Sequence, residues 1–199
     1  MYSRDVPRIQ QYVQDKGPDG LLDVATFVLA TIQNALSRVK GEVSDIKMKG
    51  VASKALWGSK RGGYEYVDNN KQSLFNSLVE KPMGIDAALA LTLDTPGMGL
   101  PKASFMLQCL GYNVGCLDSH NLTRFNVPIS ATQIGKVSDK TKMIKVDKYI
   151  SLTRKLGGSE ELWNSWCIYV AGNRANKTLP TGDMVSAYHY EAISGRSNP

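Results

Sequence analysis

The sequence predicts an all-α fold, and three observations support this prediction. Apolar residues recur at the three- and four-residue spacing of amphipathic helices, and no segment shows a comparable two-residue alternation typical of strands. Glycine and proline residues separate these segments. Apolar residues make up 42% of the 199 residues and charged residues 21%, as in ordinary folded proteins. This length suits a single helical domain over residues 1–199, either compact or divided into two small lobes around a cleft.

The first predicted helix follows the breaker Gly17-Pro18-Asp19-Gly20. Its apolar residues recur at helical spacing from Leu21 to Val39, and Gly41 is its predicted end. A short helix is expected around Val51–Leu56. The segment 58–64 that follows contains two adjacent glycines, which permit unusual backbone angles, so we expect a mobile loop there.

The middle of the chain is predicted to contain three helices. Asn70 is expected to cap the first of them, which ends at Lys81-Pro82 because the residue before a proline disfavours helical angles. The second runs from Ile85 to Leu93. After a turn rich in glycine, the third runs from Leu100 to about Leu110, and Gly111 closes it.

The remainder of the chain is also predicted to be helical. Helices are expected directly after Asp118, near Ile129–Ile134, across Lys142–Lys155 and from Ser159 to about Val170. Two glutamates follow Ser159, and acidic residues in a first turn are typical of a helix N-terminus.

Charge and cysteine content limit the classes of function. An excess of 24 Lys and Arg over 18 Asp and Glu gives a net charge of +6, which favours a polyanionic partner, although a solvated basic face would explain it equally well. The three cysteines have no CxxC spacing, so we expect no disulfide framework, metal or other cofactor. The sequence contains no run of about 18 apolar residues, which is the length needed to cross a membrane. We therefore expect no membrane partner and a cytoplasmic location.

The most informative segment is a predicted helix-hairpin-helix element at residues 86–111. Its two helices are joined by Pro96-Gly97-Met98-Gly99. Glycines in such a turn let backbone N–H groups approach a phosphate closely, and the following helix presents its positive N-terminal end to the same anion. The turn is thus predicted to bind a DNA backbone without reading bases. The alternative is a plain corner between two helices, in which the glycines serve only the turn.

The hairpin and the residues after it resemble the helix-hairpin-helix superfamily of DNA glycosylases. The resemblance is carried by the Pro-Gly-x-Gly turn, by Ala103 in the following apolar helix, and by Leu117-Asp118-Ser119-His120 after a second turn that contains glycine. The superfamily includes endonuclease III and the adenine mismatch glycosylase. The resemblance covers about residues 85–125 and implies a glycosylase-like helical fold that acts on DNA.

Within this resemblance Asp118 corresponds to the catalytic carboxylate, and Gly97 and Gly99 correspond to the phosphate-binding turn. Cleavage of an N-glycosidic bond develops positive charge on the sugar, which a nearby carboxylate stabilises. The target nucleotide must first leave the base stack, because its anomeric carbon is shielded inside the duplex. Asp118 is also a suitable helix N-cap, and the two roles are compatible.

The resemblance further implies a monofunctional enzyme, which releases a base without cutting the strand. Superfamily members that also cut the strand carry a nucleophilic lysine two residues after the second hairpin glycine, where this sequence has Pro101. Lys102 lies one residue later, about 100° around a helix. We predict that Lys102 contacts a phosphate or lies on the solvated surface.

Further DNA contacts are predicted outside the hairpin. Gln33 resembles the glutamine with which some superfamily members fill the gap left by a flipped base, and an exposed helix glutamine is the alternative. Lys60, Arg61 and Tyr64 are also predicted DNA contacts, and Tyr64 is expected to stack on unpaired bases unless it belongs to the core or the surface. His120 is expected to orient the catalytic carboxylate, to contact a phosphate, or to make a structural hydrogen bond.

The sequence therefore predicts a DNA-binding protein that resembles a monofunctional DNA glycosylase and acts on a base flipped out of duplex DNA. Two alternatives stay open, a non-catalytic DNA-binding module on the same scaffold and a glycosylase-derived enzyme that modifies bases. No role is expected for His189, and Trp163 and Trp166 are expected to pack in the core. The sequence leaves open which base is recognised and which oligomeric state the protein adopts.

Overall fold

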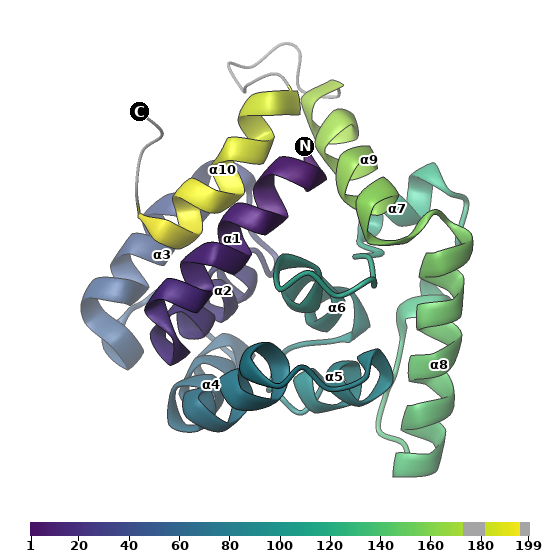
Figure 1. The fold of residues 1–199 in the computed structure, drawn as a ribbon, viewed down its shortest axis with the longest axis horizontal. Coiled ribbons are helices and arrows are strands. Elements are labelled where there is room, and N and C mark those ends of the chain that lie inside the picture. The colour runs from purple at the N-terminus through teal and green to yellow at the C-terminus, as the bar shows by residue number, and fades with distance from the viewer. Residues whose placement is uncertain (173–181, 196–199) are drawn as a thin grey trace.

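The computed structural model describes residues 1–172 and 182–195, and within these residues every regular element is a helix (Figure 1). The prediction of an all-α protein is therefore confirmed. In chain order the elements are α1 (Tyr2–Lys16), α2 (Pro18–Ala30), α3 (Leu36–Lys49), η1 (Gly50–Ala52), α4 (Ser59–Phe75), η2 (Asn76–Glu80), α5 (Ile85–Thr92), α6 (Leu100–Cys109), α7 (Ser119–Arg124), η3 (Ile129–Thr132), α8 (Asp139–Lys155), α9 (Gly158–Gly172) and α10 (Gly182–Ser194).

Helix α6 lies near the centre of the molecule, with α1, α2 and α5 packed against it (Figure 1). Leu100, Ala103, Met106 and Leu107 are all buried, together with Ser104, Gln108 and Cys109 of the same helix. A helix that is apolar around most of its circumference is stable only when neighbours cover it on several sides. The hairpin turn therefore leads directly into a helix that is buried over most of its length.

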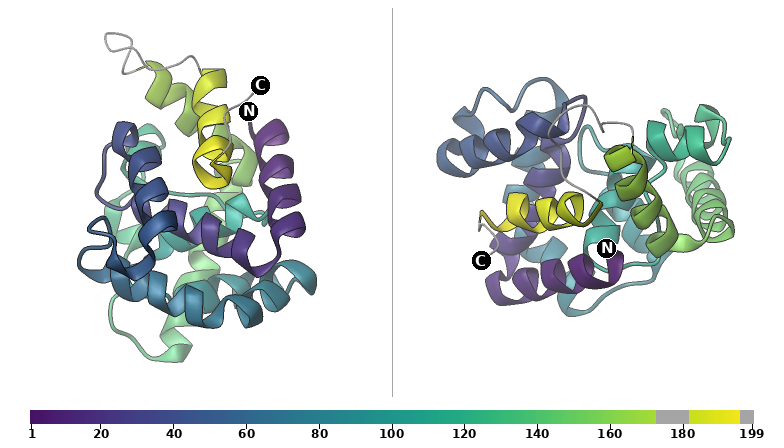
Figure 2. Two further views of the ribbon diagram at one scale, coloured as in Figure 1. Left: turned by 90° about the vertical axis from the view of Figure 1, so that its left-hand side faces the viewer. Right: turned by 90° about the horizontal axis from the view of Figure 1, so that it is seen from above.

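The last helix returns to the beginning of the chain. Helix α10 packs against α1, α2 and α3 as well as α9, and it lies beside α1 in both figures that show the ribbon (Figures 1 and 2). The rings of Tyr12 and Tyr190 meet edge to face, with centroids 6.4 Å apart. Lys47 Nζ donates a hydrogen bond to the carbonyl oxygen of Ile193 at 2.9 Å. The N-terminal helices and α10 thus form one packed unit.

The predicted helix over residues 21–39 is wrong in its extent, because the chain turns between α2 and α3. Gln33 adopts a left-handed φ of 49° in this turn. Asn34 Nδ2 donates to the carbonyl oxygen of Ala30 at 3.1 Å, which satisfies one of the carbonyls left free at the end of α2. Gly41, the predicted end of the helix, lies inside α3. Helix α1 also precedes the first helix that the sequence predicts.

The predicted loop at residues 58–64 is wrong, because α4 begins at Ser59. Its two adjacent glycines allow close packing and do not create a mobile segment. A Cβ atom at position 63 would lie 2.5 Å from the carbonyl oxygen of Pro96 and 2.9 Å from a methyl carbon of Leu29. Glycine at position 63 therefore lets α4 pack directly beneath the hairpin turn.

Two further predictions in this part of the chain need correction. Asn70 lies within α4, where its side chain donates to the carbonyl oxygen of Tyr66, so it caps no helix. Helix α4 instead continues into the π-helical turn η2, which ends before Pro82. Only the three-residue η1 forms where a short helix was expected at residues 51–56.

The predicted helices around the hairpin are confirmed. Helices α5 and α6 lie where the sequence places them, and Gly111 follows α6 with a φ of 88°. Helix α7 begins directly after Asp118. Helix α8 begins at Asp139, earlier than predicted, and η3 forms a single 3₁₀ turn within the range expected for a helix.

Candidate functional site

The hairpin turn between α5 and α6 leaves backbone donors available. Met98 N donates to the carbonyl oxygen of Thr95 at 3.1 Å, and the amides of Lys102 and Ala103 donate to that of Gly99 at 3.0 and 2.9 Å. Among the described residues nothing accepts a hydrogen bond from the amides of Gly97 and Gly99. No side chain caps α6. The turn thus presents free N–H groups at a helix N-terminus, which is suited to binding an anion.

The two hairpin glycines have different structural reasons to be glycine. Gly97 has a φ of 81°, and a Cβ atom there would lie 2.7 Å from Ser59 Oγ. Gly97 is therefore required by the fold itself. Gly99 has an extended backbone with a φ of −85°, and the nearest atom to a Cβ there would be Pro101 Cδ at 3.9 Å. The space beside Gly99 is open, and its conformation suits any residue.

Asp118 is the N-cap of α7, as the sequence predicts. Its Oδ1 atom accepts hydrogen bonds from the amides of His120 and Asn121, both at 3.1 Å. No hydrogen bond to Oδ2 comes from any residue that the structure describes. One carboxylate oxygen therefore fixes the side chain to the helix, and the other is free to interact with a ligand.

The segment that leads to Asp118 is held in place by hydrogen bonds to a buried tyrosine. Tyr149, from α8, accepts a hydrogen bond from Leu117 N and donates one to the carbonyl oxygen of Gly115, both at 3.0 Å. Its hydroxyl also lies 2.9 Å from Ser104 Oγ on α6. Burial raises the pKa of Tyr149, so the hydroxyl stays protonated. Asp118 is thus positioned by a network that joins α6, α7 and α8.

Asp118 borders a cavity of about 650 Å³. This volume lies within the range of small-molecule sites. The walls come from α2 and the turn after it, the start of α3, α6, the segment before α7, and helices α9 and α10. Four of the predicted site residues, which come from three separate parts of the sequence, meet here, namely Gln33, Lys102, Asp118 and His120. Pro101 also lines the cavity.

One wall of the cavity is aromatic. The His189 ring lies 4.8 Å from that of Trp163, 5.2 Å from that of Trp166 and 5.8 Å from that of Phe105, measured between centroids. Phe27 completes the cluster from α2. Trp163 packs in the core as expected, but it also faces the cavity, and Trp166 is only partly buried.

His189 is a cavity residue that the sequence did not reveal, since no role was expected for it. It is buried and lines the cavity from α10. Its neighbours in sequence are two tyrosines, and no motif surrounds it. Only the packing of α10 against α2 and α9 brings it to this wall.

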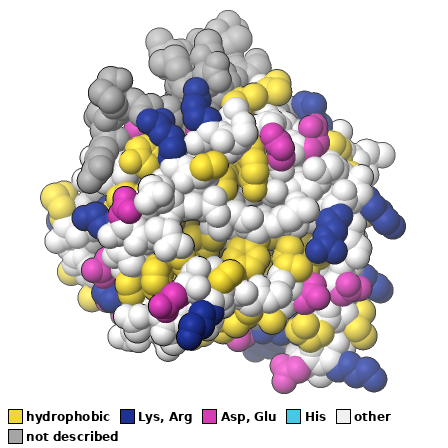
Figure 3. Space-filling model, in the orientation of Figure 1, with side chains coloured by type: hydrophobic (Ala, Val, Ile, Leu, Met, Phe, Trp, Pro, Cys, Tyr) yellow, Lys and Arg dark blue, Asp and Glu magenta, His cyan; other side chains and the backbone are white. Residues whose placement is uncertain are grey.

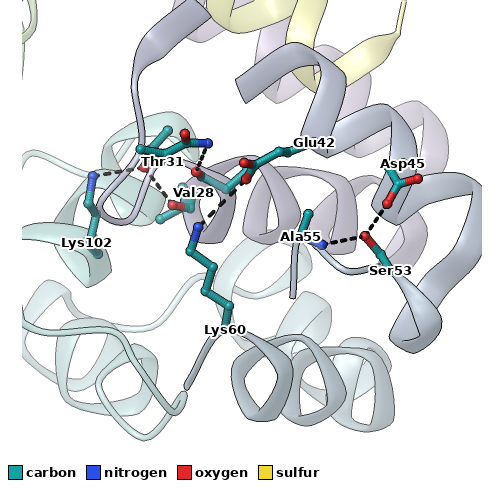
Figure 4. Close-up of polar contacts among 10 residues, drawn as sticks. Val28, Thr31, Glu42, Asp45, Ser53, Ala55, Lys60 and Lys102 are labelled. Atoms are coloured by element: carbon teal, nitrogen blue, oxygen red, sulfur yellow. Dashed lines mark hydrogen bonds and ion pairs between the residues drawn. The ribbon is translucent and has the colours of Figure 1, made fainter. Parts of the chain in front are cut away.

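Lys102 lies at the wall of the cavity, where its ammonium group is bound to α2. Its Nζ atom donates to Thr31 Oγ1 at 2.9 Å, and Thr31 in turn donates to the carbonyl oxygen of Val28 (Figure 4). Lys102 thus bridges the hairpin helix to the end of α2. Gln33, in the turn just beyond Thr31, is exposed at the edge of the same cavity.

Burial removes three of the predicted DNA contacts from the surface, and one of them is Met98 of the hairpin turn, which is 5% exposed. The Lys60 side chain is only 1% exposed, and its Nζ lies 3.8 Å from Glu42 Oε2 (Figure 4). The same atom lies 4.8 Å from the centre of the Trp57 ring. Burial lowers the pKa of Lys60 and raises that of Tyr64, which is 8% exposed. Neither side chain can contact DNA in this conformation, because α4 packs against the protein where a loop was expected. Arg61 is exposed but lies outside the cavity.

The remaining chemistry of the described residues is limited. No cluster of His, Cys, Asp and Glu among them could hold a metal ion, and no described helix is long and apolar enough to cross a membrane. Cys116 lines the cavity, but burial raises the pKa of its thiol to about 12, so it is not a thiolate nucleophile at neutral pH. Comparisons with protein families, with curated proteins and with solved structures found no match for this chain.

Proposed function

We propose that this protein binds duplex DNA through the hairpin and hydrolyses the N-glycosidic bond of a nucleotide that has rotated into the cavity. The observation that carries the proposal is the arrangement of Asp118 beside the cavity. One of its oxygens is fixed by two backbone amides, and the other accepts no hydrogen bond from the described residues. A carboxylate held in this way is preorganised to stabilise positive charge on a ligand.

The proposed binding step uses the hairpin and needs no base-specific contact. The free amides of Gly97 and Gly99 would donate to one phosphate, at the uncapped N-terminus of α6. Because Pro101 and Lys102 on the same helix line the cavity, a backbone bound at the turn lies close to the cavity entrance. The exposed Gln33 at the edge of the cavity is a candidate to occupy the space that the flipped base leaves in the stack.

The proposed chemical step breaks the bond between the base and the sugar. Water adds to the anomeric carbon, and the electron pair of the C–N bond leaves with the base, which takes up a proton. Asp118 stabilises the positive charge that develops on the sugar and accepts the proton of the attacking water. The aromatic wall formed by Trp163, Trp166 and His189 suits stacking with the planar base.

A non-catalytic DNA-binding module is the second candidate. The observation in its favour is that capping α7 is by itself a sufficient structural reason for an aspartate at position 118. On this alternative the hairpin binds DNA and the cavity holds an extruded nucleotide without cleaving it.

Base release decides between these two functions. Duplexes that each carry one damaged, mismatched or modified base are incubated with the protein and then treated with alkali, which cuts the strand at abasic sites. Strand cleavage that requires alkali, and that is lost with Asp118→Asn, supports the proposed hydrolysis. If DNA is bound but no duplex in the panel yields abasic sites, the binding module replaces the enzyme.

A further inference from the structure

The positive charge of this protein is concentrated in one segment. Residues 124–155 contain eight Lys and Arg residues and only two acidic residues, which gives this segment the whole net charge of the chain, +6. The rest of the sequence is balanced, with sixteen basic and sixteen acidic residues. A solvated basic face spread over the molecule would not give this distribution.

Most of these cations have no acidic partner. Within the described residues no ion pair forms at Arg124, Lys136, Lys140, Lys148, Arg154 or Lys155, and all six are exposed. Four lysines of the N-terminal helices differ from these cations, since Lys40, Lys47, Lys49 and Lys71 each pair with a carboxylate. Unpaired exposed cations are available to release counterions from a polyanion.

The geometry of α8 arranges several of these cations along its solvent face. Val146, Tyr149, Ile150 and Thr153 are buried, so the opposite side of the helix faces outward. Lys140, Lys148 and Lys155 are on that side. Figure 3 shows Lys and Arg side chains at several heights along the right-hand edge of the molecule, where α8 lies in Figure 1.

The basic segment adjoins both parts of the proposed DNA site. Lys142, near the start of α8, forms an ion pair with Asp94, which lies two residues before the hairpin turn. At its other end the segment includes Ile129, which lines the cavity. A duplex bound at the hairpin with one nucleotide in the cavity would therefore have its flanking backbone near α8.

We propose that the outward face of α8, with Lys140, Lys148 and Lys155, is a second contact with the phosphate backbone of DNA, outside the hairpin. This inference rests on the proposed function only in taking DNA as the ligand. Met143 and Ile144 are 40% and 47% exposed on the same helix, a feature that would also suit an acidic protein partner. Continuity with the hairpin favours DNA.

The test is the salt dependence of DNA affinity. The variant Lys140→Gln/Lys148→Gln/Lys155→Gln is compared with Lys16→Gln/Lys54→Gln/Lys81→Gln, which removes three exposed cations that are also unpaired among the described residues but lie outside the basic segment. Binding of a fluorescently labelled duplex is measured by anisotropy from about 50 to 200 mM salt. We expect the α8 variant to lower the slope of log affinity against log salt by about three units, about one for each lysine, and the control to change it by less than about one.

The outcomes separate this inference from the proposed function. Equal slopes for the α8 variant and the wild type would overturn the inference. An acidic protein would then be the better candidate partner for the exposed lysines and apolar residues of α8. Equal losses in the two triple variants would also overturn it, because total charge would then explain the effect. Base release is assayed with the same wild-type preparation. If the wild type binds DNA and releases no base, a reduced slope for α8 still supports the second contact although the enzyme proposal fails.

Discussion

Helices α6 and α7 both begin beside the cavity, but their N-termini are completed in opposite ways. Helix α6 follows Gly99 and has no side-chain cap, so donors of the turn are left free. Helix α7 follows Asp118, whose carboxylate already accepts hydrogen bonds from the amides of His120 and Asn121. The same backbone feature is thus open to an external anion in one helix and holds an internal carboxylate in the other. The difference teaches that the backbone donors of a helix N-terminus are available to an external anion only where the chain supplies no cap.

The largest effect is expected from Asp118→Asn, which changes the charge at α7 and keeps the cap. Asn is as good an N-cap as Asp, so the free energy of unfolding should change by less than about 0.5 kcal/mol. Base release should fall by about 100-fold or more, because the group proposed to stabilise the sugar cation has lost its charge. Single-turnover kinetics and thermal unfolding measure the two effects.

Asp118→Ala is the matched control for the capping role. It removes the cap as well as the charge and should cost about 1 kcal/mol of stability. The asparagine oxygen can still accept hydrogen bonds from the amides of His120 and Asn121. If Asp118→Asn nevertheless unfolds the protein, the negative charge is needed for the fold. An Asp118→Asn variant with undiminished turnover would exclude Asp118 as the catalytic carboxylate.

The next effect concerns the support beneath the open N-terminus of α6. Gly63→Ala would place a Cβ atom 2.5 Å from the carbonyl oxygen of Pro96, so we expect a loss of about 2–3 kcal/mol in unfolding free energy. At Gly62 the nearest atom to a Cβ is 3.5 Å away, and Gly62→Ala should stabilise α4 by about 0.5–1 kcal/mol. Urea denaturation of the two variants makes the comparison. Similar stabilities would mean that α4 does not seat the hairpin this closely.

A third substitution converts the open terminus into a capped one. Gly99→Asp would introduce a carboxylate at the start of α6, where the backbone angles and the open space tolerate a side chain. The new carboxylate would compete with phosphate for the free amides and repel it, and DNA affinity should fall by about tenfold at constant stability. Gly99→Asn, which caps without charge, should lose less. Equal wild-type affinity in both variants, measured near physiological salt, would show that phosphate does not bind at this turn.

The smallest effect is expected at Lys102. A lysine that cuts DNA must attack the sugar with a free amine, but the Nζ atom of Lys102 is hydrogen-bonded to Thr31. We therefore expect no protein–DNA adduct when borohydride is added to the reaction. A trapped adduct that disappears with Lys102→Ala would show that the ammonium leaves Thr31 and that the protein also cuts the strand.

The features predicted correctly from the sequence are set by a few neighbouring residues. The Pro-Gly-x-Gly turn, the end of α6 at Gly111 and the cap at Asp118 each depend on local backbone angles or on hydrogen bonds within three residues. The grouping of Gln33, Lys102 and Asp118 at one cavity is also present in the structure. The sequence did not predict this grouping, and it singled out each of the three residues only through the resemblance to a family.

The features that were predicted wrongly depend on distant contacts. Gly62 and Gly63 suggest a loop, but packing against Pro96 favours a helix that lacks side chains at that face. Lys60 has the charge of a DNA contact, yet α3 and Trp57 enclose it. His189 has no local signal, and its place at the cavity depends on α10. Secondary-structure patterns do not encode which helices meet.

The return of α10 to the first three helices has a consequence for biosynthesis. The cavity wall contains Phe27 from near the start of the chain and His189 from its last described helix. A polypeptide emerges from the ribosome N-terminal end first. The apolar surface of α1, α2 and α3 that α10 covers is therefore exposed to solvent until α10 has been synthesised. Nascent chains that stop before residue 182 should bind chaperones for longer than complete chains, and no ligand that requires this wall can stabilise them.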